Sequence, residues 1–259
     1  YHVKFNGNGA TSGTMKEIEG SYKEGMKLPA NTYKKTGYTF LGWKGSDGNL
    51  YQDEDDLMKL SMGTPVKTIT LTARWEAAAY SITYYLNGGK NNVENPSTYT
   101  CETDTITLRY PSKRGYTFGG WYSDSDFKNR VRYIENGSTG KKTLYAKWTA
   151  TRYKVTYVLN GGYNNQYNPL TYTVTTNHFS YKPATRKGYR FLGWYSDKAC
   201  TKRTYQVKKG SVGNKTVYAK WTLNRYKITY VLNGGKNNRK NPTTYTIYTA
   251  TTAYQNPTR

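Results

Sequence analysis

An internal repeat is the feature that most constrains how this chain can fold. The segments YSITYYLNGGKNNVENP, YKVTYVLNGGYNNQYNP and YKITYVLNGGKNNRKNP begin at Tyr80, Tyr153 and Tyr226, so that the two steps between their starts are equal. Trp121 and Trp194 keep the same step. A register that is held over whole units without gaps indicates duplication, in which each unit is one supersecondary module.

The repeat defines the domain organisation of the 259-residue chain. Residues 80–152 and 153–225 are complete copies, called here the second and third repeats. Residues 1–79 are a diverged first repeat, whose GYTFLGW and LTARW match GYRFLGW and VYAKW of the third repeat. Residues 226–259 are a truncated fourth repeat that lacks both tryptophan-bearing segments. We expect the fourth repeat either to fray or to pack against the third repeat as an added edge strand.

Each repeat has the residue pattern of short β-strands. In the third repeat, Tyr153, Val155 and Tyr157 alternate with Lys154 and Thr156, which is the period of a strand with one buried face. The Asn-Gly-Gly that follows tolerates positive φ angles and predicts a turn. The β-rich composition of later segments predicts three more strands, at residues 171–176, 189–195 and 215–221, with a turn at 187–188.

Two details of this pattern are less regular. Gly193 interrupts the third strand, which predicts the close approach of a ring or of another backbone. The second and third repeats show no amphipathic helix. In the first repeat, residues 53–62 could form a short helix, because four acids crowd its first turn and Gly63 follows it.

The composition is contradictory until the repeat is considered. Leu, Ile, Val and Phe make up only about 15% of a chain with a net charge of +23, which is typical of disorder. Aromatic residues, however, make up 16%. We therefore expect each complete repeat to build its core largely from Tyr and Trp, with irregular tyrosines such as Tyr163, Tyr167 and Tyr205 exposed. The tryptophans assigned to the structural core are Trp43, Trp75, Trp121, Trp148, Trp194 and Trp221.

The motifs GYxFxGWY and LYAKW, together with YLNGG and GSxGNKTxYAKW, resemble the Listeria–Bacteroides repeat family. These are the B-repeat modules of internalin-like bacterial surface proteins. The resemblance implies a mainly β or α+β fold, with a tandem array of small β-grasp-like repeat modules, each about 73 residues long. It also implies export, usually as part of a large cell-surface protein of a Gram-positive or gut bacterium. The expected state is a monomeric, elongated array at the bacterial cell surface or secreted from the cell.

The sequence contains no constellation of catalytic residues, and we expect no enzyme activity and no cofactor. The third repeat contains a single acid, Asp197, so that a carboxylate pair present in every repeat is excluded. Nucleophile-elbow, phosphate-loop and HExxH motifs do not occur. YLNGGKNN contains glycines but lacks the Lys-Ser/Thr of a phosphate loop, and is interpreted as a hairpin turn.

Metal sites are not expected either. His2 and His178 lie far apart in the sequence, without a Cys/His cluster near them, which argues against zinc. The four acids at 53–56 lack the spaced oxygens of a calcium loop, and a solvated helix start is favoured over calcium binding. Cys101 and Cys200 align with otherwise apolar positions and are interpreted as small hydrophobic residues.

The positive charge is concentrated in one part of the chain. The net charge is +1 for the first repeat, +5 for the second, +12 for the third and +5 for the fourth. A structural requirement shared by all repeats would charge each of them alike. The candidate polyanion-binding residues of the third repeat are Lys182, Arg186, Lys187, Arg190, Lys198, Lys202, Arg203, Lys208, Lys209 and Lys215.

Several functions remain open at this point. The first hypothesis is a non-catalytic stalk and adhesion segment, in which the basic residues either keep an exported protein soluble or bind cell-wall or host anionic polymers. Candidate polymers are teichoic acid, sulfated or uronic glycans, and anionic lipid headgroups. The alternative is a set of carbohydrate-binding accessory modules of a larger secreted glycan-active enzyme. Nucleic acid is a disfavoured partner. We expect no transmembrane segment, because no run of 18 apolar residues occurs, and the sequence shows no signal peptide.

Overall fold

The computed structural model describes residues 1–20, 26–56, 59 and 68–259. These residues form two compact units, one of residues 1–113 and 118–148, the other of residues 114–117 and 149–259. The described residues contain no helix, and their strands form several small sheets. The chain is therefore a mainly β tandem-repeat array. Among the helix-like residues 53–62, residues 53–56 form a turn and a bridge, and most of the rest lie outside the described residues.

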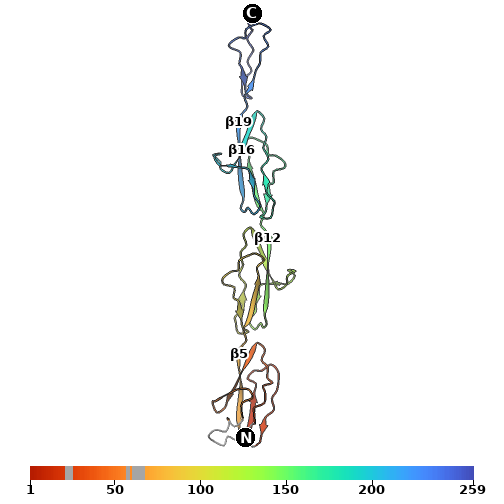
Figure 1. Cartoon of the computed structure of the whole chain (residues 1–259), viewed down its shortest axis with the longest axis vertical. Helices are drawn as coiled ribbons and strands as arrows, with labels where there is room; N and C mark the ends of the chain where they lie inside the picture. The colour runs from red at the N-terminus through yellow and green to blue at the C-terminus, as the bar shows by residue number, and fades with distance from the viewer. Residues whose placement is uncertain (21–25, 57–58, 60–67) are drawn as a thin grey trace. The chain divides into compact units, whose positions relative to one another are not determined.

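The third repeat shows the fold most completely. Its five-stranded sheet has the order β14-β13-β19-β16-β17, and a separate two-stranded sheet pairs β15 with β18. The strands are β13 (Tyr153–Val158), β14 (Thr171–Tyr172), β15 (Phe179–Ser180), β16 (Tyr189–Tyr195), β17 (Arg203–Thr204), β18 (Gln206–Val207) and β19 (Lys215–Leu223). Figure 1 shows the long strands β16 and β19 side by side, and their pairing is antiparallel. β13 lies on the other side of β19 and runs parallel to it.

The second repeat has the same arrangement. Its main sheet has the order β10-β9-β12-β6-β7, and β8 pairs with β11. Its strands are β6 (Tyr80–Tyr85), β7 (Thr98–Tyr99), β8 (Ile106–Thr107), β9 (Tyr116–Tyr122), β10 (Arg130–Val131), β11 (Tyr133–Ile134) and β12 (Lys142–Ala150). In both repeats the segment between the first strand and the next long strand (residues 86–115 and 159–188) contains two short strands and no helix. A helix does not form there because Thr, Asn, Gly and Pro dominate this segment without a helical apolar period.

The first and fourth repeats are variants of this plan. The first repeat has the sheet order β2-β1-β5-β3-β4, and the fourth pairs only β20 with β21. The strands are β1 (His2–Asn6), β2 (Ile18–Glu19), β3 (Tyr38–Gly45), β4 (Leu50–Tyr51), β5 (Ile69–Ala77), β20 (Tyr226–Lys227) and β21 (Thr244–Tyr245). Because β20 and β21 form their own sheet, the fourth repeat does not extend the sheet of the third, and that part of the expectation is wrong. The fourth repeat does contact the third, through a hydrogen bond between the hydroxyls of Tyr189 and Tyr248 at 2.7 Å.

Aromatic residues form much of each core. In the third repeat, Trp194 is 2% exposed, and Tyr172 packs with Val155 and Val207 in the neighbouring cluster. The hydroxyl of Tyr157 donates to the carbonyl oxygen of Pro169 at 3.0 Å, so this residue joins the core without an unpaired polar group. Trp43 and Trp121 are buried, whereas Trp75, Trp148 and Trp221 are partly buried at the edges of their clusters. Tyr163, Tyr167 and Tyr205 are exposed, as expected.

Gly193 marks a bulge between β16 and β19. The pairing register shifts between Phe191 and Gly193, and Gly193 has a φ of +138°. A Cβ atom at this position would lie 2.8 Å from Nε of Arg203. The group that approaches Gly193 is therefore a guanidinium, rather than the ring or backbone that the sequence predicts.

Candidate polyanion-binding surface of the third repeat

The candidate cations of the third repeat come from three segments. One group lies between residues 182 and 190, the second lies in and after the turn that ends β16, and the third runs from the end of β18 to the start of β19. Eight of the ten are exposed, and Arg186 and Lys215 are half-buried. None of the ten forms an ion pair with a residue that the structure describes. Their charges are therefore not neutralised by neighbouring carboxylates.

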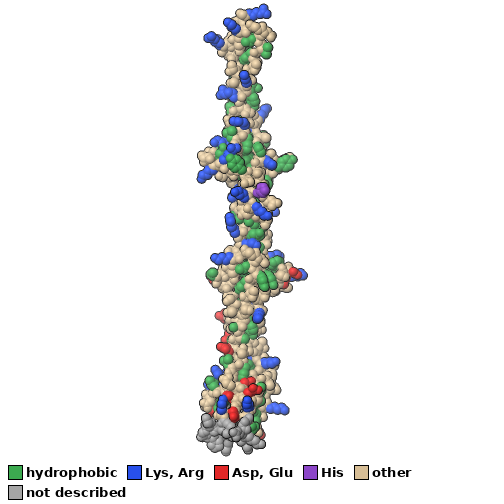
Figure 2. All heavy atoms as spheres, viewed as in Figure 1, with side chains coloured by type: hydrophobic (Ala, Val, Ile, Leu, Met, Phe, Trp, Pro, Cys, Tyr) green, Lys and Arg blue, Asp and Glu red, His purple; other side chains and the backbone are tan. Residues whose placement is uncertain are grey.

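Figure 2 shows how unevenly the acids are distributed. On the face shown, the acidic side chains (red) lie on the first and second repeats, whereas Lys and Arg side chains (blue) occur on every repeat. The third repeat has 13 basic residues and one acid. Clustered charges of one sign, left unpaired, raise the local concentration of oppositely charged partners.

Two of the candidate arginines have structural contacts as well. Nη1 of Arg186 donates to the carbonyl oxygen of Asn160 at 2.8 Å, and the guanidinium lies 3.8 Å from the centre of the Tyr189 ring. The guanidinium of Arg203 lies 5.1 Å from the Tyr205 ring. These contacts fix both side chains against the fold. The more mobile charges are the exposed lysine ammonium groups, whose long stems remain free to adapt to a polymer.

Lys220 is a further cation of the third repeat, outside the ten candidates. Its Nζ donates to the carbonyl oxygen of Cys200 at 3.2 Å and lies 5.1 Å from the centre of the Tyr195 ring. The alternation of buried and exposed residues along β19 is the sequence signal that could have placed Lys220 on the outer face of the sheet. Because its ammonium already has these two partners, Lys220 fixes the turn after β16 to the sheet.

Asp197, the single acid of the third repeat, is engaged by the backbone. Its carboxylate accepts hydrogen bonds from the backbone N–H groups of Thr201 at 3.0 Å and Lys202 at 2.6 Å. These bonds lower the pKa of the Asp197 carboxyl below its usual value. The carboxylate thus shapes the turn that carries Lys198 and Lys202, and Asp124 has the same role in the second repeat.

A pH-dependent loss of this turn is expected. Because the pKa of Asp197 is depressed in the folded chain, its contribution to stability is present above the pKa of the unfolded chain and is lost as the pH falls through the folded pKa. Hydrogen exchange at the Thr201 and Lys202 amides should therefore accelerate as the pH falls through this range, after correction for intrinsic exchange. Asp197→Asn should remove most of that additional pH dependence. An equal pH dependence in the variant would contradict the assignment.

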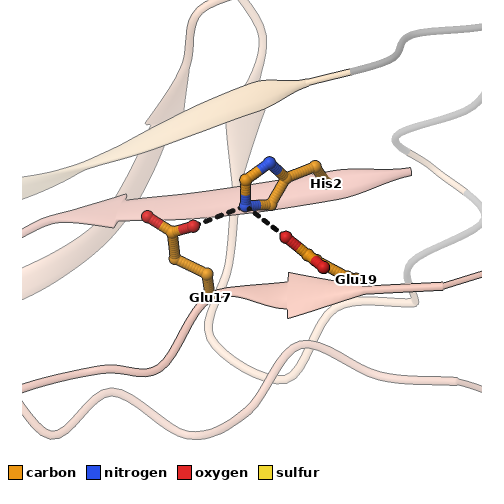
Figure 3. A group of neighbouring side chains, drawn as sticks. All are labelled: His2, Glu17 and Glu19. Carbon is orange, nitrogen blue, oxygen red and sulfur yellow. Dashed lines mark hydrogen bonds and ion pairs between the residues drawn. The ribbon is translucent and has the colours of Figure 1, made fainter.

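A histidine and two glutamates come together in the first repeat. The spacing of these residues in the sequence did not predict this cluster. Strand β1 pairs with β2, so that His2 lies opposite Glu19, and Glu17 lies two residues earlier. Figure 3 shows Nε2 of His2 between the two carboxylates, 2.5 Å from Glu17 and 3.3 Å from Glu19. The Lys4 ammonium is 3.9 Å from Glu17. These contacts join side chains of β1 to those of β2 and the residue before it, and so support the pairing of the two strands.

Two family models match the three longer repeats. The model of the Listeria-Bacteroides repeat domain matches residues 80–147 and 153–220, and the divergent InlB B-repeat domain matches residues 1–79. The chain belongs to the Listeria–Bacteroides repeat family. The resemblance inferred from GYxFxGWY and LYAKW is thereby confirmed. Repeat domains of this family are generally non-catalytic.

Three curated relatives place the array in larger proteins. The chain is 32% identical over 242 residues to a Gly-rich membrane protein of Evansella cellulosilytica, covering 91% of this chain and 27% of the relative. It is 29% identical to another membrane protein of that organism, covering 89% of this chain and 33% of the relative. It is 29% identical to Internalin H of Listeria monocytogenes, covering 56% of this chain and 26% of the relative.

The chain thus spans about a quarter to a third of the length of these relatives. The family and the Internalin H relative indicate a repeat segment of a bacterial surface protein. The described residues include no helix long and apolar enough to cross a membrane.

Proposed function

We propose that this chain is a non-catalytic spacer and adhesion segment of a bacterial cell-surface protein, displayed outside the cell, and that its third repeat binds acidic polymers. The observation that carries the proposal is the charge of the third repeat. It has 13 basic residues and one acid, and hydrogen bonds from backbone N–H groups already engage that acid. Teichoic acid and anionic glycans are the polymers that a surface protein meets outside the cell.

The physical basis of binding is counterion release. A polyanion holds condensed cations, and each lysine that replaces one releases it, so that affinity falls steeply with salt. No single geometry is needed, because the exposed lysines of the third repeat have long flexible stems. If the basic residues served only to keep the protein soluble, their positions would not matter, since any repeat could supply the charge. That role therefore does not predict that binding depends on the lysines of the third repeat.

Binding of the intact chain to poly(glycerol phosphate), the backbone of a teichoic acid, tests this proposal. We expect the triple variant Lys182→Glu/Lys198→Glu/Lys202→Glu to bind at least tenfold more weakly at 50 mM NaCl, and wild-type affinity to fall more than tenfold between about 50 and 200 mM. Titration calorimetry measures both quantities.

The matched control changes the same net charge elsewhere. Lys16→Glu/Lys34→Glu/Lys44→Glu reverses three exposed lysines of the first repeat. We expect this variant to bind within about threefold of wild type, with a weak effect of total charge. Equal losses in both triple variants would support a general solubility charge, and the absence of binding at low salt would overturn the proposal.

A further inference from the structure

The same hollow occurs at the same place in the second and third repeats. In the second repeat its volume is about 480 Å³, and in the third about 310 Å³. Four lining positions are identical in the two copies. They are Ser123, Ser138, Lys142 and Thr143 in the second repeat, and Ser196, Ser211, Lys215 and Thr216 in the third. A hollow that occurs at equivalent positions in two copies is a feature of the module.

A lysine on the core-facing side of the sheet lines this hollow. Lys215 begins β19 and is in alternation with Val217 and Ala219, which are 2% and 1% exposed. The first repeat has Ile69 at the equivalent position, and Ile69 is 1% exposed. Lys215 is therefore half-buried at the end of a core row, and its ammonium has no ion-pair partner among the described residues. A partly buried, unpaired ammonium gains from an anionic partner.

The two hollows differ in charge at two equivalent positions. Glu135 lines the hollow of the second repeat, whereas Lys208 occupies that position in the third. The second hollow also has Lys141 where the third repeat has Asn214, so that its lining includes two lysines and one acid. The lining of the third hollow includes two lysines and no acid. Only the third hollow therefore lacks an anion of its own.

Hydroxyl groups complete the lining of the third hollow. Ser196, Ser211 and Thr216 line it together with Tyr181, which replaces Leu108 of the second repeat. Burial raises the pKa of Tyr181 to about 12, further above neutral pH, where the phenol of any tyrosine is protonated. Thr204 lines it as well, so the hollow combines two ammonium groups with five hydroxyl-bearing side chains, of which Ser196 already donates to the Lys202 carbonyl oxygen at 3.4 Å. A tetrahedral oxyanion, with more acceptor sites than a carboxylate, matches so many donors.

We propose that the hollow of the third repeat, formed by Ser196, Lys208, Ser211, Lys215 and Thr216, binds a phosphate group of a polyol-phosphate polymer. The proposal rests on the proposed function, and gives that diffuse attraction a specific anchoring point. Exposed lysines elsewhere on the repeat attract the polymer at long range, and the hollow holds one phosphate by charge-assisted hydrogen bonds. The second hollow, with Glu135 in its lining, rejects the same group.

Two single substitutions with the same charge change test the hollow in the intact chain. Lys208→Glu gives the third hollow the acid of the second, whereas Lys209→Glu reverses a neighbouring exposed lysine that does not line it. In titrations with poly(glycerol phosphate) at 50 mM NaCl, we expect Lys208→Glu to weaken binding at least tenfold and Lys209→Glu less than threefold. Glu135→Lys should strengthen binding by providing a second hollow of the binding type.

Inorganic phosphate provides a second readout that does not depend on the polymer. In NMR titrations, phosphate should shift the amide signals of Ser211 and Lys215 in wild type and in Lys209→Glu, but not in Lys208→Glu. Equal polymer affinities of the Lys208 and Lys209 variants would overturn the hollow and leave the proposed function standing. A wild-type chain that binds no polymer would overturn the proposed function, and the phosphate shifts alone would then decide the hollow. Stronger displacement of phosphate by inorganic sulfate would overturn the choice of phosphate.

Discussion

Trp194→Ala is expected to destabilise the third repeat by about 3–5 kcal/mol, since a large aromatic side chain is removed from a small core. Trp194 is 2% exposed. Its ring lies 5.2 Å from the Tyr157 ring and 5.3 Å from the Phe191 ring, both edge to face. Its Nε1 also donates to the carbonyl oxygen of Lys182 at 2.9 Å. A module of this size has little surplus stability, so the substitution should unfold the repeat.

Hydrogen exchange in the intact chain locates this effect. Protection of the amides in β13 and β19 should collapse in Trp194→Ala, while the first repeat keeps its protection. The matched control is Tyr163→Ala, which removes an aromatic ring that is 76% exposed and should change stability by no more than about 0.5 kcal/mol. An unchanged exchange pattern in Trp194→Ala would mean that the ring does not support the core.

A gentler pair of substitutions separates the hydrogen bond from the ring. Trp194→Phe keeps an aromatic ring but removes the N–H that the Lys182 carbonyl accepts. Trp43 occupies the equivalent position of the first repeat, and its Nε1 is buried without a hydrogen-bond partner among the described residues. We therefore expect Trp43→Phe to lower the free energy of unfolding less than Trp194→Phe does. Trp43 already carries an unsatisfied N–H donor, which phenylalanine lacks.

The sequence predicted the parts of the fold that depend on local pattern. Alternation along residues 153–158 identified β13 and its buried face, and Asn-Gly-Gly identified a turn, in which Asn160 and Gly161 have φ angles of +48° and +85°. The predicted strand at 171–176 is much shorter, because the backbone N–H of Thr176 donates back to the Thr173 carbonyl and begins a turn. The parallel pairing of β13 with β19 was not predicted, since alternation determines which side is buried but not which strand is adjacent.

The described part of the helix predicted in the first repeat, residues 53–56, forms a turn and a bridge. The acids at 53–55 match the composition of a helix start, but the Asp53 carboxylate accepts a hydrogen bond from the backbone N–H of Asn31 at 2.8 Å. Asp55 accepts one from the backbone N–H of Gln52 at 2.7 Å. The first bond ties the Asp53 carboxylate to a distant segment, and the second closes a turn of the kind that also caps a helix. Composition alone could not distinguish acids that begin a helix from acids that bind the backbone of a turn.

The candidate site also has one part that the sequence predicted and one part that it did not. The excess of lysine in the third repeat was visible in the sequence, because charge can be counted along the chain. The hollow was not, because Ser196, Lys208 and Lys215 come from three separate segments that only the folded sheet brings together. Its one available signal was the reversal of charge between Glu135 and Lys208, which occupy the same position in successive repeats.

Gly162→Ala is expected to destabilise the third repeat by about 1–3 kcal/mol, the usual cost of forcing a methyl group into a packed region. A Cβ atom at this position would overlap the ring of Trp221 and lie 2.8 Å from the Thr185 carbonyl oxygen. Neither neighbour can move freely. Nε1 of Trp221 donates to the Leu159 carbonyl at 2.9 Å, and the Thr185 carbonyl accepts from the Tyr163 backbone N–H at 2.8 Å.

A control and a double-mutant cycle separate the causes of this loss. Gly210 has a φ of +83° with no atom within 4 Å of its added Cβ, so Gly210→Ala should cost only the backbone strain, about 1 kcal/mol. Trp221→Phe removes the outer ring that the Gly162 methyl group would meet. If that ring is the obstacle, Gly162→Ala should cost less in the Trp221→Phe background than in wild type, as measured by denaturant unfolding. Equal costs in both backgrounds would instead assign the collision to the Thr185 carbonyl oxygen.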